Sequence, residues 1–297
     1  MTTEGTAANR AAKPASLRRE LRLLVEALVV AYLVVTFGFT TVGVIGSSME
    51  PTLTGASASG NLVSRLFAGD RLFIPKYETW LRRTGLLGGY QRGEIVVLRE
   101  PDNAPTAVLS GKRDLVIKRI VGLPGDRVRI EAGQVFVNGV AIAESFTVST
   151  GALRLHTVDF PQVVVEGGEV TALVMGFNDA RARASTPLLP SRGVHVSPLP
   201  VDDPRVQLYY GALLGSILVP DDAPQGVPMV LDLVVPPGRY FVLGDNRSFG
   251  GSQDSRYFGT VDAMSITGRA TAVIWPFSRA GGGNVRGLSP AAAYRLQ

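Results

Sequence analysis

The stretch AYLVVTFGFTTVGVIGSSMEP, residues 31–51, joins an apolar run to a serine at its end. The run begins at Ala27 and carries no charged residue as far as Ile45. As a helix it would cover roughly 28 Å, enough to cross the hydrocarbon core of a bilayer. We therefore predict a membrane anchor over residues 23–45. Ser48 follows three residues later, so any chemistry it performs is directed at something in or on the membrane.

The residues before this run predict the orientation of the anchor. Residues 1–22 form a polar, basic tail, and positive charge before a span is typical of a cytoplasmic N-terminus. A cleavable signal would have a shorter apolar region that ends at a small-residue cleavage site. We expect an uncleaved, single-pass anchor in the cell membrane, with the C-terminal domain outside the cytoplasm.

Composition excludes several classes of function. Among 297 residues, 45% are hydrophobic and 19% are charged, which allows a sizeable core and argues against wholesale disorder. The chain has no cysteine, so disulfides, thiolate metal sites and a cysteine nucleophile are excluded. The net charge of +5 comes from scattered basic residues without a nucleic-acid-binding motif. We expect no metal, no cofactor and no nucleic-acid partner.

Beyond the anchor, the pattern predicts a mainly β protein. Short β-branched runs bounded by turn residues indicate strands near residues 94–98, 115–117, 128–130, 135–137 and 239–243. Asn138-Gly139, between apolar residues, predicts a tight hairpin. No long helical pattern follows the anchor.

The same pattern suggests how the chain is divided. Residues 46–140 and 238–280 would form a catalytic β core, and residues 281–297 a C-terminal tail. Residues 141–237 are looser and rich in Pro, Gly and Thr, which predicts an inserted second β region. Within it, residues 206–219 are too short for a second span and are expected to form a strand pair.

A serine nucleophile needs a base, and the choice lies between histidine and lysine. The two histidines, His156 and His195, lie in the loose segment, where a surface or packed role is the simpler interpretation. Lys118 follows Val116-Ile117 in an apolar strand, where burial would lower its pKa toward neutrality. The alternative for Lys118 is an edge-strand charge that reaches water.

Four blocks of sequence stand out: GSSMEPTL at 46–53, GDRLFIPK at 69–76, IKRIVGLPGD at 117–126, and GDNR at 244–247 with SQDSRYFG at 252–259. Together they resemble bacterial type I signal peptidases, which are membrane-anchored Ser/Lys endopeptidases. The resemblance implies a β-rich extracytoplasmic domain that cleaves signal peptides from secreted preproteins after small residues. It implies secretory preproteins and the lipid bilayer as partners, with the protein export translocon as a further candidate.

The resemblance also implies roles for individual residues. Ser48 would be the nucleophile, Lys118 its general base, and Ser252 the hydroxyl that orients the lysine amine. The loop before Ser252 is about two residues longer than the common pattern, which leaves Ser248 and Ser255 as alternatives. Residues expected to hold this loop, partly through an Asp254–Arg256 ion pair, are Arg119, Asp245, Asn246, Arg247, Asp254 and Arg256.

Binding of the substrate is less clearly marked in the sequence. Gly46 stands where some members of the family carry a serine that donates to the oxyanion, so the Ser48 N–H and another donor would act here. Val44, Ile45 and Ile117 flank the dyad and could line shallow apolar pockets; ordinary core packing is the alternative. An aromatic-basic stretch over residues 77–87 is expected to rest on the lipid interface, or else to be a surface loop.

Two other classes of protein are alternatives for this sequence. A self-cleaving repressor of the SOS type also uses a Ser/Lys dyad on a related β fold. It needs a DNA-binding module before the peptidase, where this chain has an apolar span. A non-catalytic anchored β protein would not be expected to retain Ser48, Lys118 and Ser252 together.

Overall fold

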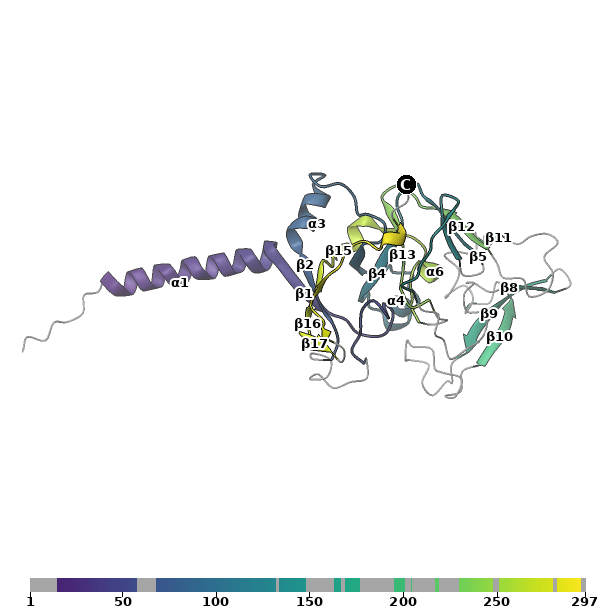
Figure 1. Ribbon diagram of the computed structural model, residues 1–297, viewed down its shortest axis with the longest axis horizontal. Helices are drawn as coiled ribbons and strands as arrows, with labels where there is room; N and C mark the ends of the chain where they lie inside the picture. The colour runs from purple at the N-terminus through teal and green to yellow at the C-terminus, as the bar shows by residue number, and fades with distance from the viewer. Residues whose placement is uncertain are drawn as a thin grey trace, which may run out of the picture.

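One exposed helix projects from a body built of short β-strands (Figure 1). The computed structural model describes residues 15–57, 68–131, 134–147, 163–166, 169–176, 195–200, 204, 217–218, 230–247, 251–279 and 282–294. The mainly β class predicted from the sequence is confirmed. Within these residues the helices that follow the anchor are short: α3 (Lys76–Arg83), α4 (Pro105–Ser110) and α6 (Ser255–Phe258).

The projecting helix is α1 (Ala15–Leu33), which continues as a π-helical turn, η1 (Val34–Gly38). Its segment Leu17–Gly38 has a mean hydropathy of 2.0 over its apolar window and is long and apolar enough to cross a membrane. Near its polar end, Arg22 Nε donates to Glu26 at 2.7 Å, so two charges inside the segment are paired. The structure thus contains one candidate span among the described residues.

The helix does not cover the whole predicted anchor of residues 23–45. It begins inside the predicted basic tail and ends at Gly38, and Phe39–Gly43 form strand β1. β1 pairs antiparallel with β2 (Arg71–Pro75), from Phe39 opposite Pro75 to Gly43 opposite Arg71. Thr40, Thr41 and Val42 are β-branched, and such residues favour a pleated strand when a partner strand is present. The end of the apolar run therefore belongs to the β body.

Two sheets position the segments that carry Ser48 and Lys118. The first has the order β1-β2-β16-β19, with β16 at Ala272–Trp275 and β19 at Arg286–Gly287. The second has the order β14-β13-β4-β3-β15. Its strands are β14 (Val261–Asp262), β13 (Arg239–Leu243), β4 (Leu115–Gly122), β3 (Ile95–Arg99) and β15 (Ile266–Arg269). Met49 and Leu53 pack with Val97 and Ile117 in one buried cluster, which fixes the segment around Ser48 against β3 and β4.

A third sheet has the order β11-β12-β5-β6-β7. Its strands are β11 (Ile217–Leu218), β12 (Val230–Val234), β5 (Arg127–Glu131), β6 (Gln134–Val137) and β7 (Val140–Ala141). The predicted hairpin joins β6 and β7, with positive φ at Asn138 (52°) and Gly139 (83°), as a two-residue turn of this kind requires. The hairpin prediction is confirmed.

The predicted insertion, residues 141–237, is partly corrected. Its middle contains a separate sheet of β8 (Val163–Glu166), β9 (Glu169–Gly176) and β10 (His195–Pro200), drawn at the end of the body away from α1 (Figure 1). Both ends belong to the third sheet instead, because β12 pairs with β5 and Ile142 is buried in the same core as Leu231. Most of residues 206–219, and His156, lie outside the described residues.

The predicted C-terminal tail, residues 281–297, is also corrected. Strand β17 (Ser278–Arg279) pairs with β18 (Gly282–Gly283), and β19 then pairs with β16. The 3₁₀ turn η6 (Ala292–Tyr294) buries Tyr294, 3% exposed, in the same core as Phe241. We call residues 282–294 the C-terminal strap. Its apolar residues are too few and too scattered to show the regular spacing that would predict a strand or a helix.

Candidate active site

The structure brings Ser48 and Lys118 into contact, although they are 70 residues apart in the chain. Lys118 Nζ lies 3.2 Å from Ser48 Oγ. Ser48 sits in a tight turn in which the Glu50 N–H donates to the Ser47 carbonyl at 3.1 Å. The Ser48 carbonyl in turn accepts from the Asn246 N–H at 3.1 Å. The serine hydroxyl is therefore held by a fixed backbone next to the amine.

Lys118 lies in the middle of β4 and is only 2% exposed. Burial lowers the pKa of its amine from 10.5 to about 8, and the nearby Asp254 carboxylate opposes part of that shift. Besides the Ser48 hydroxyl, Nζ contacts the Ile117 carbonyl oxygen at 3.0 Å. A lysine with a pKa near 8 carries an appreciable neutral fraction close to physiological pH, as a general base requires.

The loop between β13 and α6 is held by a buried ion pair. Arg256 Nε lies 2.9 Å from Asp254 Oδ1, and the Asp254 carboxylate also accepts from the Gly244 N–H at 2.9 Å. Burial alone would raise the pKa of Asp254, but the Arg256 guanidinium and these hydrogen bonds lower it below its usual value. The loop thus places a permanent carboxylate and a permanent cation near Lys118.

A second buried ion pair connects β4 to the serine turn. Arg119 Nη2 lies 2.6 Å from Asp245, and both side chains are almost fully buried. Thr52 Oγ1 donates to the same carboxylate at 2.5 Å, and Asn246 Nδ2 donates to the Ser47 carbonyl at 3.2 Å. These contacts tie the residue after Lys118 to the turn that carries Ser48.

Ser252 lies close to the pair but does not bond to Lys118. Its side chain is 2% exposed, and Oγ has no hydrogen-bond partner among the described residues, so the predicted bond to the amine is absent here. A Cβ at Gly244 would lie 2.2 Å from Ser252 Oγ and 2.5 Å from the Ser48 carbonyl oxygen, so only glycine fits between them. Of the alternatives, Ser255 Oγ accepts from the Val242 N–H at 2.9 Å, and Ser248 lies outside the described residues.

Comparison with known proteins places the chain in a family. It matches the family described as "Signal peptidase, peptidase S26" over residues 17–185 and 191–275. The chain belongs to this family. The resemblance seen in the four sequence blocks is therefore confirmed, and the protein is a peptidase of the signal peptidase type, whose activity is the removal of signal peptides from preproteins.

Individual relatives agree with this family. The signal peptidase is 28% identical over 262 residues to the probable signal peptidase I-2 of Synechocystis sp., covering 88% of this chain and 74% of that protein. It is 25% identical over 253 residues to signal peptidase IB of Staphylococcus aureus, covering 85% and 86%. A crystal structure of a signal peptidase I from Enterococcus faecalis aligns at a TM-score of 0.26 and 22% identity, covering 62% of this chain and 99% of that one.

Two strand edges near the Ser48–Lys118 pair of the signal peptidase have no partner strand among the described residues. Among the described strands, β1 is the outer strand of its sheet. β4 pairs with β13 only from Arg119 to Gly122, so its first residues leave that edge open. Of the predicted pocket residues, Val44 and Ile117 are 3% and 8% exposed in one cluster, whereas Ile45 is 46% exposed.

One set of contacts that holds the active-site loop of the signal peptidase was not predicted from the sequence. Arg247 Nη1 donates to Glu144 at 2.7 Å, and the Tyr294 hydroxyl donates to the same carboxylate. The ring of Phe146 covers the Arg119 guanidinium at 4.5 Å. Glu144 and Tyr294 lie in segments without a readable motif, so no local signal in the sequence could have joined them to Arg247.

Proposed function

We propose that Ser48 is the nucleophile and Lys118 the general base with which this signal peptidase cuts secreted preproteins after small residues. The observation that carries the proposal is the 3.2 Å contact between a buried lysine amine and a serine hydroxyl. Burial is the largest influence on the amine, and it favours the neutral form that can accept a proton.

The chemistry then follows a Ser/Lys scheme. Neutral Nζ takes the proton from Ser48 Oγ as Oγ bonds to the scissile carbonyl carbon, and the resulting ammonium gives that proton to the leaving amine. Water hydrolyses the remaining ester with Lys118 again as base. Among the described residues the Ser48 backbone N–H has no hydrogen-bond acceptor, so we assign it as an oxyanion donor. Ser252 is the group we assign to orienting the amine, by a hydrogen bond formed when substrate is bound.

The substrate peptide would bind as an added strand. An extended chain can pair with a free sheet edge while alternate side chains enter pockets. Lys118 lies on the open edge of β4, and β1 ends five residues before Ser48. Val44 and Ile117 are the groups we assign to the walls of a shallow pocket, with Ile45 exposed beside them. Only small side chains would fit such a pocket.

We also propose that α1 anchors the enzyme with its N-terminus in the cytoplasm and its β body outside. The amphipathic stretch after β2 supports contact with lipid. Tyr77 and Trp80 on α3 are 55% and 53% exposed. The ring of Trp80 lies 5.9 Å from that of Phe37, at the end of the candidate span. Aromatic side chains of this kind are enriched at the membrane–water interface. The translocon would deliver preproteins to the same surface.

Cleavage of a purified preprotein by the full-length chain in lipid–detergent micelles tests the dyad. Ser48→Ala and Lys118→Ala are each expected to lower kcat by at least about 10³-fold while the protein stays folded. Ser110→Ala and Lys112→Ala, at exposed positions, are the matched controls and should cleave at the wild-type rate. Wild-type turnover by Lys118→Ala would show that the base is another group.

A further inference from the structure

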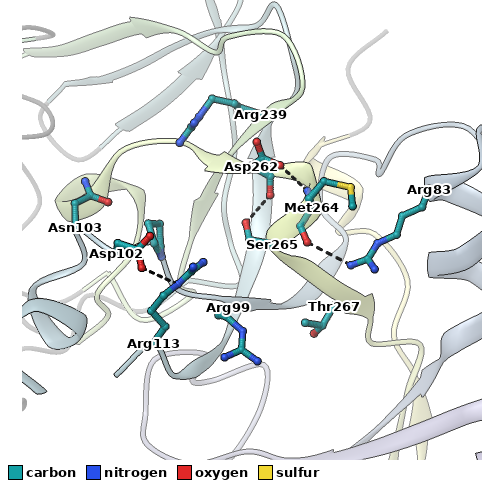
Figure 2. Close-up of a pocket in the computed structure, with 11 residues that line it drawn as sticks. Arg83, Arg99, Asp102, Asn103, Arg113, Arg239, Asp262, Met264, Ser265 and Thr267 are labelled. Atoms are coloured by element: carbon teal, nitrogen blue, oxygen red, sulfur yellow. Dashed lines mark hydrogen bonds and ion pairs between the residues drawn. The ribbon is translucent and has the colours of Figure 1, made fainter. Parts of the chain in front are cut away.

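A hollow lies where the end of α3 meets β3, β15 and the turn before β15, and none of the dyad residues line it (Figure 2). Its volume is about 660 Å³. Its charged lining residues are Arg83, Arg99, Asp102, Arg113, Arg239 and Asp262. Four arginines against two aspartates leave the lining with a formal charge of 4 − 2 = +2. The hollow is therefore cationic, in a part of the protein that the peptidase mechanism does not use.

Little of this positive charge is neutralised by the protein itself. Arg113 is the one arginine of the lining with a carboxylate partner among the described residues, Asp102 at 3.3 Å. That pair is at the rim, because the Asp102 side chain is 85% exposed. Asp262 uses its carboxylate to accept from the Met264 N–H at 2.7 Å, which caps the turn before β15.

The other three guanidinium groups have no carboxylate partner among the described residues. Arg83 Nη2 donates to two backbone carbonyls, at 3.3 Å and 3.2 Å. Arg239 donates to the hydroxyl and carbonyl oxygens of Thr260. Arg99 is exposed and has no described acceptor. Figure 2 shows Arg83 and Arg113 on opposite sides of the hollow. Several planar guanidinium groups that line one hollow can bind a phosphate group by charge-assisted hydrogen bonds.

The position of the hollow indicates which kind of molecule would carry such a phosphate group. Arg83 is the last residue of α3, the helix whose Trp80 contacts Phe37 at the end of the candidate span. Met264, 64% exposed, adds an apolar rim on the same side. We propose that the hollow binds the phosphate headgroup of an anionic phospholipid and so fixes how the β body lies on the bilayer. The proposal rests on the proposed membrane anchoring and is independent of the catalytic assignments.

Native mass spectrometry of the full-length chain tests this, with retained lipid counted after titration with phosphatidylglycerol or phosphatidylcholine in detergent. The wild type should retain phosphatidylglycerol in preference to phosphatidylcholine. An Arg83→Gln/Arg99→Gln double variant should lower that affinity roughly 30-fold, the value expected for two cations near an anionic surface. Arg127→Gln/Arg129→Gln removes the same charge from β5, outside the hollow, and should bind as the wild type does.

Each other outcome overturns the proposal. Equal retention of the two lipids, or an unchanged affinity in the Arg83/Arg99 variant, would exclude a headgroup site here. A parallel titration with free glycerol phosphate separates the sources, since binding of the free ion as tight as that of the lipid would assign the hollow to a solute. The readout is bound mass, which is measured independently of peptidase activity.

Discussion

Lys118 and Arg119 are neighbours on β4, both buried, and opposite in chemical behaviour. The Lys118 amine can lose its proton because burial lowers its pKa to about 8. The Arg119 guanidinium instead forms a buried ion pair with Asp245 at 2.6 Å. Strand alternation sends the two side chains to opposite faces, so one position supplies a base and the next a fixed structural cation.

Ser252 and Ser255 are expected to respond differently to loss of the hydroxyl. Ser252→Ala removes a buried Oγ that has no described partner, so the free energy of unfolding should stay the same or rise slightly. Its kcat should fall by about 10²-fold, because the amine would no longer be oriented. Both quantities can be measured on the full-length chain in detergent, by preprotein cleavage and by urea unfolding.

Ser255→Ala is the matched comparison and should give the reverse pattern. It leaves the buried Val242 N–H without its acceptor, which costs about 1–3 kcal/mol of stability. Its kcat should stay at the wild-type value. If Ser252→Ala cleaved at the wild-type rate, the orienting role would belong to another group.

Among the elements, the strands with local signals were predictable and those with distant partners were not. β5, β6 and the Asn138-Gly139 turn are fixed by neighbours in sequence, and the pattern predicted them. β1 was predicted as part of a helix, because an apolar β-branched run fits both states until β2 is there to pair with it. In the site, the motif blocks indicated Ser48, Lys118 and Ser252. The clamp formed by Glu144 and Tyr294 depends on two segments, 150 residues apart in the chain, that meet only in the fold.

This clamp, Arg247–Glu144–Tyr294, joins the active-site loop to the C-terminal strap. Burial would lower the pKa of Arg247, but the Glu144 carboxylate raises it above its ordinary value, so the guanidinium stays charged. Glu144→Ala would leave a buried guanidinium unpaired and should cost about 3–5 kcal/mol of unfolding free energy. Tyr294→Phe keeps the packing and loses one hydrogen bond, about 1 kcal/mol. Urea unfolding measures both, and equal costs would show that the ion pair adds no stability beyond the hydrogen bond to Tyr294.

For the molecule as a whole, the apolar helix and the exposed aromatic residues of α3 define one side of the β body. The sequence indicated both features, but it could not show that Trp80 lies beside Phe37, because that contact depends on how η1 leads into β1. In the orientation that we propose, the dyad, the open strand edges and the aromatic residues of α3 would all lie near the bilayer. Such an arrangement suits a substrate that is itself held in the bilayer.

The position of Trp80 can be measured directly, because the chain has only two tryptophans. In a Trp275→Phe variant reconstituted into vesicles, Trp80 is the sole indole and should be quenched by lipids brominated near the headgroup. Trp275, isolated in a Trp80→Phe variant, is the control. No stronger quenching for Trp80 than for Trp275 would place α3 away from the bilayer.

The pH dependence of preprotein cleavage tests most directly the claim that buried Lys118 activates Ser48. The base acts only in its neutral form, so kcat/KM for the full-length enzyme should fall as pH drops through the Lys118 pKa, with the acid limb centred near 8. Lys118→Arg, which cannot deprotonate in this range, should be inactive at every pH. An acid limb near 6.5, the ordinary value for histidine, or one at the unperturbed lysine value of about 10.4, would contradict the account.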